Sequence, residues 1–398
     1  MLESMTRSRF VLAALGLTTL LAACGGPDEP RVATAESPAP PGSRFPSIAA
    51  GSERLYLMWT EASEDSVPRV RLSAFDGRKW NDPTTVVEAS ELFVNWADFA
   101  SLVAFDGERL AAHWLVRQRG GSFAYDVAVA TSEDGGSSWS PAGRPHRDDS
   151  AAEHGFVSLT PEVEGRIGIV WLDGREMSGG GPMRLMYTRW NGVSFEEEEI
   201  LDPDVCTCCQ TSAVSADGDL LVAYRGHAVG EIRDILLVRR VDGEWSKPRV
   251  VHADGWKIGA CPVNGPALDA RGETVAVAWF TAASADRRVL VAFSSDGGRT
   301  FDPPIRLDGG DPLGRVDLAM FEDGSVAVSW LEAGTEGAEV RVRHVSSAQA
   351  AGPASILGTT GKDRSSGFPR LERFEGALWA TWTDDSRPPR VALARIDF

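Results

Sequence analysis

Hydrophobic and polar residues alternate with a period of two along most of the chain beyond residue 43, and this alternation predicts β-strands. One alternating segment, which ends in an aromatic residue, recurs along the chain. The seven copies are RLYLMW to Trp59, RLAAHW to Trp114, RIGIVW to Trp171, DLLVAY to Tyr224, TVAVAW to Trp279, SVAVSW to Trp330 and ALWATW to Trp382. Subtracting these residue numbers gives spacings of 51 to 57 residues.

A repeat of about 50 residues made of strands is typical of a β-propeller blade. One blade cannot bury both of its faces, so the copies should pack side by side around an axis with the strand-end aromatics between them. We therefore predict an all-β propeller over residues 44–398, with seven four-stranded blades, or six if the terminal units share one. The last unit supplies only three strands. We expect RVATAES, from Arg31, or the stretch just before Arg44 to add the fourth strand and close the ring.

Two turns after predicted third strands share one pattern. Residues 132–139 read SEDGGSSW and residues 294–301 read SSDGGRTF, both of the form S-x-D-x-G-x-(S/T)-(W/F). The aspartate is expected to accept turn amide hydrogen bonds, the second glycine to take a positive φ, and the aromatic to plug the blade edge. The residues with these structural roles are Asp134, Gly136, Trp139, Asp296, Gly298 and Phe301.

This pattern resembles the Asp-box, or BNR repeat, of the sialidase superfamily, and the resemblance covers essentially all of residues 44–398. It implies a fold rather than an activity. Sialidases are six-bladed, hold a carboxylate with three arginines, and use a Tyr nucleophile paired with a Glu and an Asp as acid/base. The matching arginines would be Arg44, Arg225 and Arg315. Asp98 or Asp173 would handle protons.

The nucleophile is the weak point of that resemblance. The family places its tyrosine in the late blades, whereas no tyrosine follows Tyr224 in this chain. A tyrosine also needs an adjacent carboxylate to act as a nucleophile at neutral pH, and the sequence indicates no such pair.

The N-terminus predicts export and lipid attachment. Residues 1–23 combine basic residues with a short apolar run, which is typical of a signal peptide. They end before Cys24 in Leu-Ala-Ala-Cys, which resembles the bacterial lipobox, and Gly25 rather than Asp follows the cysteine. We therefore expect a lipoprotein anchored through Cys24, in the outer rather than the inner membrane. Residues 24–43 are rich in Pro, Gly, Ser and Ala, so we interpret them as a flexible tether.

The charge of the chain limits its partners. With 40 Lys+Arg against 57 Asp+Glu, the formal net charge is −17. No basic face is indicated, so a nucleic-acid partner is not expected.

Cysteines are concentrated at one place. The run DVCTCCQ holds Cys206, Cys208 and Cys209 and leads into the fourth unit, while Cys261 leads into the fifth. Because adjacent blades place these loops side by side, we expect the four cysteines to converge. In an envelope compartment they would form disulfides, a thiolate site for copper or zinc, or a redox dithiol. His154 or His227 would complete a metal site.

These features together predict a membrane-anchored propeller that binds a ligand or metal, or acts as a scaffold. Its site should lie on the axial face beside the cysteines. The partner would be a carbohydrate, another small ligand or an envelope protein. The alternative is an exo-acting glycoside hydrolase of sialidase type on anionic sugars, in which the three arginines would hold the substrate.

Overall fold

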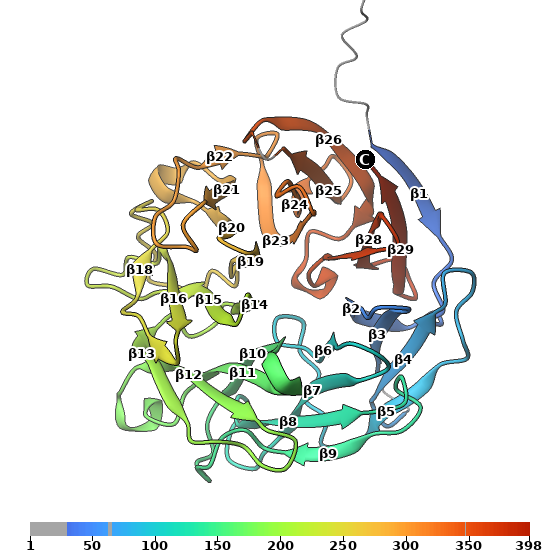
Figure 1. Ribbon diagram of the computed structural model, residues 1–398, viewed down its shortest axis with the longest axis vertical. Helices are drawn as coiled ribbons and strands as arrows, with labels where there is room; N and C mark the ends of the chain where they lie inside the picture. The colour runs from blue at the N-terminus through green and yellow to red at the C-terminus, as the bar shows by residue number, and fades with distance from the viewer. Residues whose placement is uncertain (1–29, 63–65, 347) are drawn as a thin grey trace, which may run out of the picture.

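The computed structural model describes residues 30–62, 66–346 and 348–398. They form seven antiparallel sheets around an axis, with β2, β6, β10, β14, β19 and β23 nearest to it (Figure 1). This confirms the predicted seven-bladed, four-stranded propeller and excludes the six-bladed alternative. Within these residues, no helix has the length and apolar character of a membrane span. The predicted signal peptide and Cys24 lie outside the described residues.

The first three blades follow the order of the sequence. Blade 1 comprises β2 (Ser43–Ala50), β3 (Leu55–Glu61), β4 (Arg69–Phe75) and β5 (Thr84–Glu88). Blade 2 comprises β6 (Ser101–Ala104), β7 (Leu110–Arg117), β8 (Tyr125–Ser132) and β9 (Ser140–Gly143). Blade 3 comprises β10 (His154–Pro161), β11 (Ile167–Asp173), β12 (Met183–Trp190) and β13 (Glu199–Val205).

The remaining blades continue in the same way. Blade 4 comprises β14 (Ser212–Ala216), β15 (Asp219–Arg225), β16 (Ile235–Val241), β17 (Glu244–Trp245) and β18 (Arg249–Val250). Blade 5 comprises β19 (Ala267–Arg271), β20 (Thr274–Thr281), β21 (Arg288–Ser294) and β22 (Ile305–Arg306). Blade 6 comprises β23 (Pro312–Met320), β24 (Val326–Ala333), β25 (Ala338–Val345) and β26 (Ala351–Thr360). Blade 7 comprises β27 (Arg370–Phe374), β28 (Ala377–Asp384), β29 (Arg390–Asp397) and β1 (Arg31–Ala35).

Four single 3-10 turns connect strands at the blade edges. They are η1 (Val163–Gly165), η2 (Met177–Gly179), η3 (Ala283–Ala285) and η4 (Arg364–Ser366). Each has only three residues, so the described chain is all-β apart from these turns.

The aromatic ends of the second strands fill the space between blades, as predicted. Trp59, Trp171, Trp279 and Trp330 are at most 1% exposed. Three of these indoles donate to a carboxylate two residues later on the same strand, and the pairs are Trp59–Glu61 at 2.9 Å, Trp171–Asp173 at 2.8 Å and Trp330–Glu332 at 2.8 Å. A buried indole N–H needs an acceptor, and these acidic residues supply it.

The ring is closed by the N-terminal strand. β1 pairs antiparallel with β29, from Arg31 opposite Asp397 to Ala35 opposite Leu393, and the two lie side by side at the C-terminus (Figure 1). The first of the two predicted closing segments is therefore the right one. The interpretation of residues 24–43 as a tether is wrong for Arg31–Ala35, because these residues are part of blade 7. Ser43 likewise opens β2.

The two turns with the shared pattern have nearly identical geometry. Asp134 accepts from the backbone N–H of Ser138 at 2.8 Å and from its hydroxyl at 2.6 Å. Asp296 makes the same two contacts to Thr300, also at 2.8 and 2.6 Å. These bonds hold the pKa of both aspartates below their usual range. The prediction that the aspartates accept turn amides is confirmed.

The glycine of each turn lies against the preceding blade. Gly136 has a φ of +83°, and a Cβ there would lie 2.0 Å from Leu72 of β4. Gly298, with a φ of +78°, approaches Leu237 of β16 in the same way. Trp139 and Phe301 pack on the cores between these blades. A side chain at either glycine would therefore separate neighbouring blades.

We predict that removing β1 destabilises the ring. A chain that begins at Glu36 loses five strand pairs to β29, each with a net value of about 1 kcal/mol. Its melting temperature should fall by on the order of 5–10 °C relative to a chain that begins at Pro30. Differential scanning calorimetry of the two truncations measures the difference. Equal melting temperatures would show that β1 does not stabilise the closed ring.

Candidate functional site

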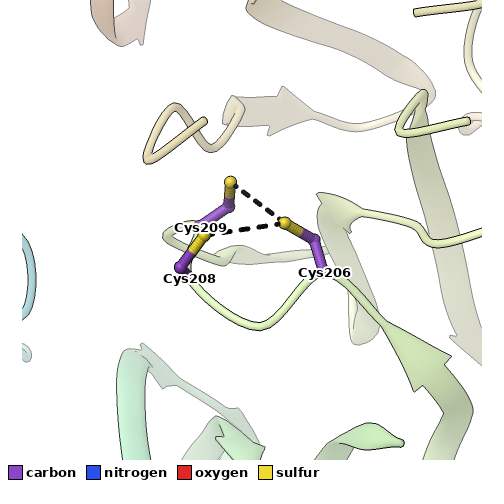
Figure 2. Close-up of side chains that lie close together, drawn as sticks. All are labelled: Cys206, Cys208 and Cys209. Atoms are coloured by element: carbon purple, nitrogen blue, oxygen red, sulfur yellow. Dashed lines mark hydrogen bonds between the residues drawn. The ribbon is translucent and has the colours of Figure 1, made fainter. Parts of the chain in front are cut away.

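Three cysteines form a compact group where β13 ends and the chain turns inward to β14. Cys206 Sγ lies 3.5 Å from Cys209 Sγ and 4.0 Å from Cys208 Sγ (Figure 2). All three side chains are buried in a core that joins blades 3 and 4. The group forms because a single tight loop directs its sulfur atoms to one point.

The loop is fixed at its inner end by contacts to two other blades. Gln210 donates to the carbonyl of Ala97 at 2.6 Å and accepts from the backbone N–H of Gly265 at 3.2 Å. Gly265 presses so closely on the backbone of Gln210 that a Cβ there would lie 2.1 Å from its carbonyl oxygen. The three thiols are therefore held in place before any ligand binds.

The surroundings favour one thiolate among the three thiols. The Cys208 and Cys209 thiols, and then Arg225, lower the pKa of Cys206 against the effect of burial. Burial raises the pKa of Cys209 to about 12. Arg233 also interacts with Cys206. The negative charge of Cys206 contributes to raising the pKa of Arg233. Two guanidinium groups thus stabilise negative charge on the sulfur cluster.

The predicted convergence of four cysteines holds for three of them as a cluster. Cys261 is exposed, and its Sγ lies 4.0 Å from Thr207 Oγ1, at the rim of the same loop. Among the described residues, all four are free thiols. Cys206 and Cys209 are also three positions apart, so the run contains a C-x₂-C spacing.

Neither predicted histidine joins the sulfur atoms. His227 Nδ1 lies 2.7 Å from Asp204 and its Nε2 3.4 Å from Glu231. His154 lies between blades 2 and 3, where its ring stacks on His146. Both assignments to the cysteine site are therefore wrong: strand β10 places His154 one blade away, and neighbouring carboxylates engage His227.

The predicted arginine clamp is not assembled. Arg225 is 2% exposed and donates to the carbonyls of Asn264 and Phe280 at 2.9 and 2.8 Å. Arg315 donates to Ser366 at 2.9 Å and to the carbonyl of Gly367 at 3.0 Å. Both guanidinium groups join neighbouring blades, so they cannot grip a ligand.

Two more of the predicted catalytic residues, Arg44 and Asp173, also have structural partners. Arg44 pairs with Asp385 at 3.3 Å. Asp173 accepts from Trp171 and lies 2.6 Å from Arg175 Nη2. Each of these residues is therefore held by hydrogen bonds or ion pairs to a different partner, although the resemblance implies that they act together in one site.

Aromatic side chains fill the start of the inner strands. Phe45 of β2 and Phe99 before β6 stack at 6.1 Å, and Phe99 and Phe368 lie 6.0 Å apart. Phe45 and Phe156 have positive φ at register shifts of β2 and β10. Phe99 and Phe156 also line an axial cavity of about 340 Å³ between the inner strands. Gln210 of the cysteine loop lines this cavity, whereas Cys206, Cys208 and Cys209 do not.

Asp98 lines this cavity and belongs to a carboxyl–tyrosine–carboxyl chain. The Tyr125 hydroxyl lies 2.9 Å from Asp98 Oδ2 and 2.9 Å from Glu153 Oε1. Burial raises the pKa of Asp98 to about 7 and that of Glu153 to about 7. Because a hydroxyl has one proton, Tyr125 donates to one group and accepts from the other, which is protonated.

The hydrogen-bonded series Asp98–Tyr125–Glu153 overturns the expectation that no tyrosine has a carboxylate partner. Tyr187 also pairs with Glu162, and Tyr224 with Asp202, each at 2.6 Å. The signal was present in the sequence. Tyr125 opens the third strand of blade 2 and Glu153 precedes the first strand of blade 3, so the adjacency used for the cysteines would have found the pair. Burial raises the pKa of Tyr125, however, which makes it a poor nucleophile.

No protein-family model and no curated protein matches the sequence. Among solved structures, a polysaccharide lyase described as a PL25 ulvan lyase gives a TM-score of 0.57 at 11% identity, over 87% of this chain and 91% of that chain. The GH93 α-L-arabinofuranosidase of Fusarium graminearum gives 0.51 at 12% identity, over 77% and 96%. The NanB sialidase of Streptococcus pneumoniae gives only 0.43 at 13% identity, over 89% and 68%.

The two likenesses above a TM-score of 0.5 concern the fold alone. The protein is an all-β propeller of seven four-stranded blades, and its structural neighbours include glycoside hydrolases and polysaccharide lyases. A fold of this kind hosts unrelated activities, so function has to be argued from the residues of the site.

We predict that Asp98 makes stability depend on pH. Its pKa of about 7 in the folded protein exceeds the unperturbed value of 3.8, so its stabilising contribution is present at low pH and is lost as pH rises through 7. Asp98→Asn, which stays neutral, should gain stability relative to the parent between pH 5 and 8, by up to ~3 kcal/mol. Denaturant unfolding at several pH values measures this.

The matched control is Asp134→Asn. The pKa of Asp134 lies below its usual range, so its contribution is lost only at acid pH and is constant between pH 5 and 8. A difference between Asp98→Asn and the parent that did not change with pH would contradict the buried, proton-binding state of Asp98.

Proposed function

We propose that this protein is an envelope lipoprotein whose propeller binds a soft metal ion through Cys206, Cys208 and Cys209. The observation that carries the proposal is the convergence of three buried sulfur atoms, all within 4.8 Å of one another. Soft thiolate ligands select Cu(I) or Zn²⁺. A buried pocket of sulfur also protects Cu(I) from solvent.

The ligand number favours Cu(I) over Zn²⁺. A structural zinc site is four-coordinate and tetrahedral. Within the described residues, the group contains three sulfur ligands and no histidine or carboxylate. Three thiolates carry three negative charges, and a monovalent ion neutralises only one of them. Arg225 and Arg233 lie beside Cys206 and offset part of the remaining negative charge.

The lipoprotein part of the proposal depends on the N-terminal sequence. The apolar run, the Leu-Ala-Ala-Cys segment and the Pro-rich residues that precede β1 support a lipid anchor at Cys24, with the outer membrane as its location. The Asp134 and Asp296 turns support assignment of the repeats to the Asp-box type. The body would then lie close to the membrane surface and present the metal site there.

We expect the reduced protein to bind one equivalent of Cu(I) under anaerobic conditions. Cys206→Ser should lower the Cu(I) affinity by on the order of 100-fold or more. Loss of a metal ligand weakens binding at least as much as loss of a residue that hydrogen-bonds to a ligand. Competition with a chromophoric Cu(I) chelator measures the affinity. Zn²⁺ should bind more weakly than Cu(I) in the same assay.

Cys261→Ser is the matched control, because Cys261 is exposed and outside the sulfur group. It should bind Cu(I) as tightly as the parent. Thiol counting before reduction separates the alternatives. A Cys206–Cys209 disulfide that cannot be reduced without unfolding, or equal binding by Cys206→Ser, would refute the metal site.

A second candidate function is cleavage of an anionic carbohydrate. It is favoured by Asp98 and Glu153, whose pKa values of about 7 suit proton transfer at neutral pH. Asp98 faces a cavity of about 340 Å³, and two structural neighbours are described as a polysaccharide lyase and an arabinofuranosidase. Because Arg225 and Arg315 are buried in structural contacts, the sialidase-type clamp would not contribute.

This candidate predicts an activity that depends on Asp98. A panel of fluorogenic glycosides, sialosides included, and of uronic-acid polysaccharides should give turnover at neutral pH. Asp98→Ala should lower kcat at least 100-fold. Cys206→Ser should retain the activity, since the sulfur group takes no part in this chemistry. If no member of the panel is turned over, the carbohydrate-cleaving candidate fails and metal binding is the one proposed function that stands.

A further inference from the structure

A second group of ligand-type side chains lies between blades 2 and 3, and neither function above uses it. His146 follows β9 and His154 opens β10. Their rings are parallel, with centroids 3.8 Å apart and planes at 2°. Both side chains are 0% exposed. Two buried imidazoles stacked face to face need charged or polar partners at their edges.

One edge of the ring pair is already occupied. Asp148 Oδ1 lies 3.1 Å from His154 Nε2 and 3.4 Å from His146 Nδ1. Arg175 Nη2 lies 3.3 Å from the same Asp148 oxygen and 2.6 Å from Asp173. A guanidinium group therefore supplies the positive charge at this edge.

The other edge has more acceptors than protons. A neutral His154 has one proton, which serves either Asp148 at Nε2 or the carbonyl oxygen of Tyr125, 3.3 Å from Nδ1. With the proton on Nε2, Nδ1 keeps a lone pair and also lies 3.6 Å from Asp126 Oδ1. His146 Nε2 lies 3.2 Å from the same Asp126 oxygen. Lone pairs that face one another in a buried site are unfavourable unless a cation lies between them.

The hydrogen bonds confirm that these atoms converge rather than pair. Both nitrogens of His146 and the Oδ1 atom of Asp126 are buried and have no hydrogen-bond partner. Their separations are short enough for hydrogen bonds, but their directions are not. Arg144 holds the other oxygen of Asp126 at 3.2 Å, so Oδ1 stays directed at the two rings.

The charge of the site fits a divalent ion. Three carboxylates lie beside the rings, those of Asp126, Asp148 and Asp173, and Glu198 joins the group through Arg175. Two guanidinium groups pair with them, those of Arg144 and Arg175. With neutral imidazoles the site therefore has an excess of two negative charges. Buried charge of this kind is costly unless a counter-ion is present.

We propose that His146 Nε2, His154 Nδ1 and Asp126 Oδ1 bind a divalent first-row metal ion such as Zn²⁺. Zinc–nitrogen and zinc–oxygen bonds of about 2.0–2.1 Å at tetrahedral angles place ligand atoms about 3.3 Å apart. The observed separations of 3.2 and 3.6 Å between the imidazole nitrogens and Asp126 bracket that value. The carbonyl of Tyr125 is positioned to add a fourth ligand.

The surrounding groups would complete such a site. Asp148 accepts from His154 Nε2, which faces away from the ion, and lies 3.4 Å from His146 Nδ1; carboxylates orient histidine ligands in this way. The two rings must rotate substantially about their side-chain bonds to direct both lone pairs at one ion, because each lone pair lies in its ring plane and the planes are parallel. Imidazole with carboxylate is a harder ligand set than three thiolates, so this site and the cysteine site select different ions.

The test uses the full chain with Cys206→Ser, Cys208→Ser and Cys209→Ser, which removes thiolate binding. After dialysis against a chelator, this protein is titrated with Co²⁺ alone and then with Zn²⁺. We expect one equivalent of Co²⁺ to bind with visible d–d absorption and no thiolate-to-metal band, and Zn²⁺ to displace it. Binding should weaken at acid pH, because the metal ligands must be deprotonated.

His146→Gln and Asp126→Asn should each abolish the Co²⁺ signal in this background. His252→Gln is the matched control, since His252 pairs with Asp254 at 2.8 Å on another blade. Circular dichroism melts confirm that the variants are folded, and Asp126→Asn provides a second test if His146→Gln is not. No Co²⁺ binding by the protein with these three cysteines replaced overturns the proposal. So does undiminished binding by both variants.

Discussion

The structure depends on one constraint: each blade buries its faces only when a neighbour covers them. The second strands are almost fully buried, and Val222, Ala223 and Val277 are 0% exposed. Hydrophobic burial of this kind is available to a blade only inside the ring. The pairing of β1 with β29 is therefore more than an added strand. It joins the two ends of the chain in one sheet and lets the first and seventh blades cover each other.

The same constraint brings polar residues together that are far apart in the sequence. Loops that lead into neighbouring inner strands must converge as the ring closes. Gln210 thus reaches Ala97 across 113 positions of sequence, and Tyr125 meets Asp98 and Glu153. Blade interfaces near the axis hold buried carboxyls, arginines and thiols for this reason. Most of these groups serve the fold, as Arg225 and Arg315 do, and only those left without partners are candidates for ligands.

The repeat made the fold predictable. Seven alternating segments that end in aromatic residues predicted the blade number, the need for a closing strand and the adjacency of Cys261 to the loop that holds the other three cysteines. The site was less predictable, because side chains in one loop set can turn toward different partners. His154 has the right position along its blade but faces His146, and Asp173 looks catalytic although it accepts from Trp171. A pattern of residue types places a side chain at a blade interface and does not show which neighbour it contacts.

Two groups in this ring combine burial with missing partners, and they differ in chemistry. The cysteine loop places three soft sulfur atoms beside two arginines. This arrangement suits a monovalent ion, because the arginines offset negative charge that such an ion leaves on the thiolates. The histidine pair between blades 2 and 3 has surplus carboxylate charge and ligand atoms of intermediate hardness. Free thiols can stay buried as small hydrophobic groups. Buried imidazole and carboxylate atoms without hydrogen bonds cannot, since each lost its water on folding. On physical grounds the histidine site has the stronger need for an ion, although the cysteine run is more conspicuous in the sequence.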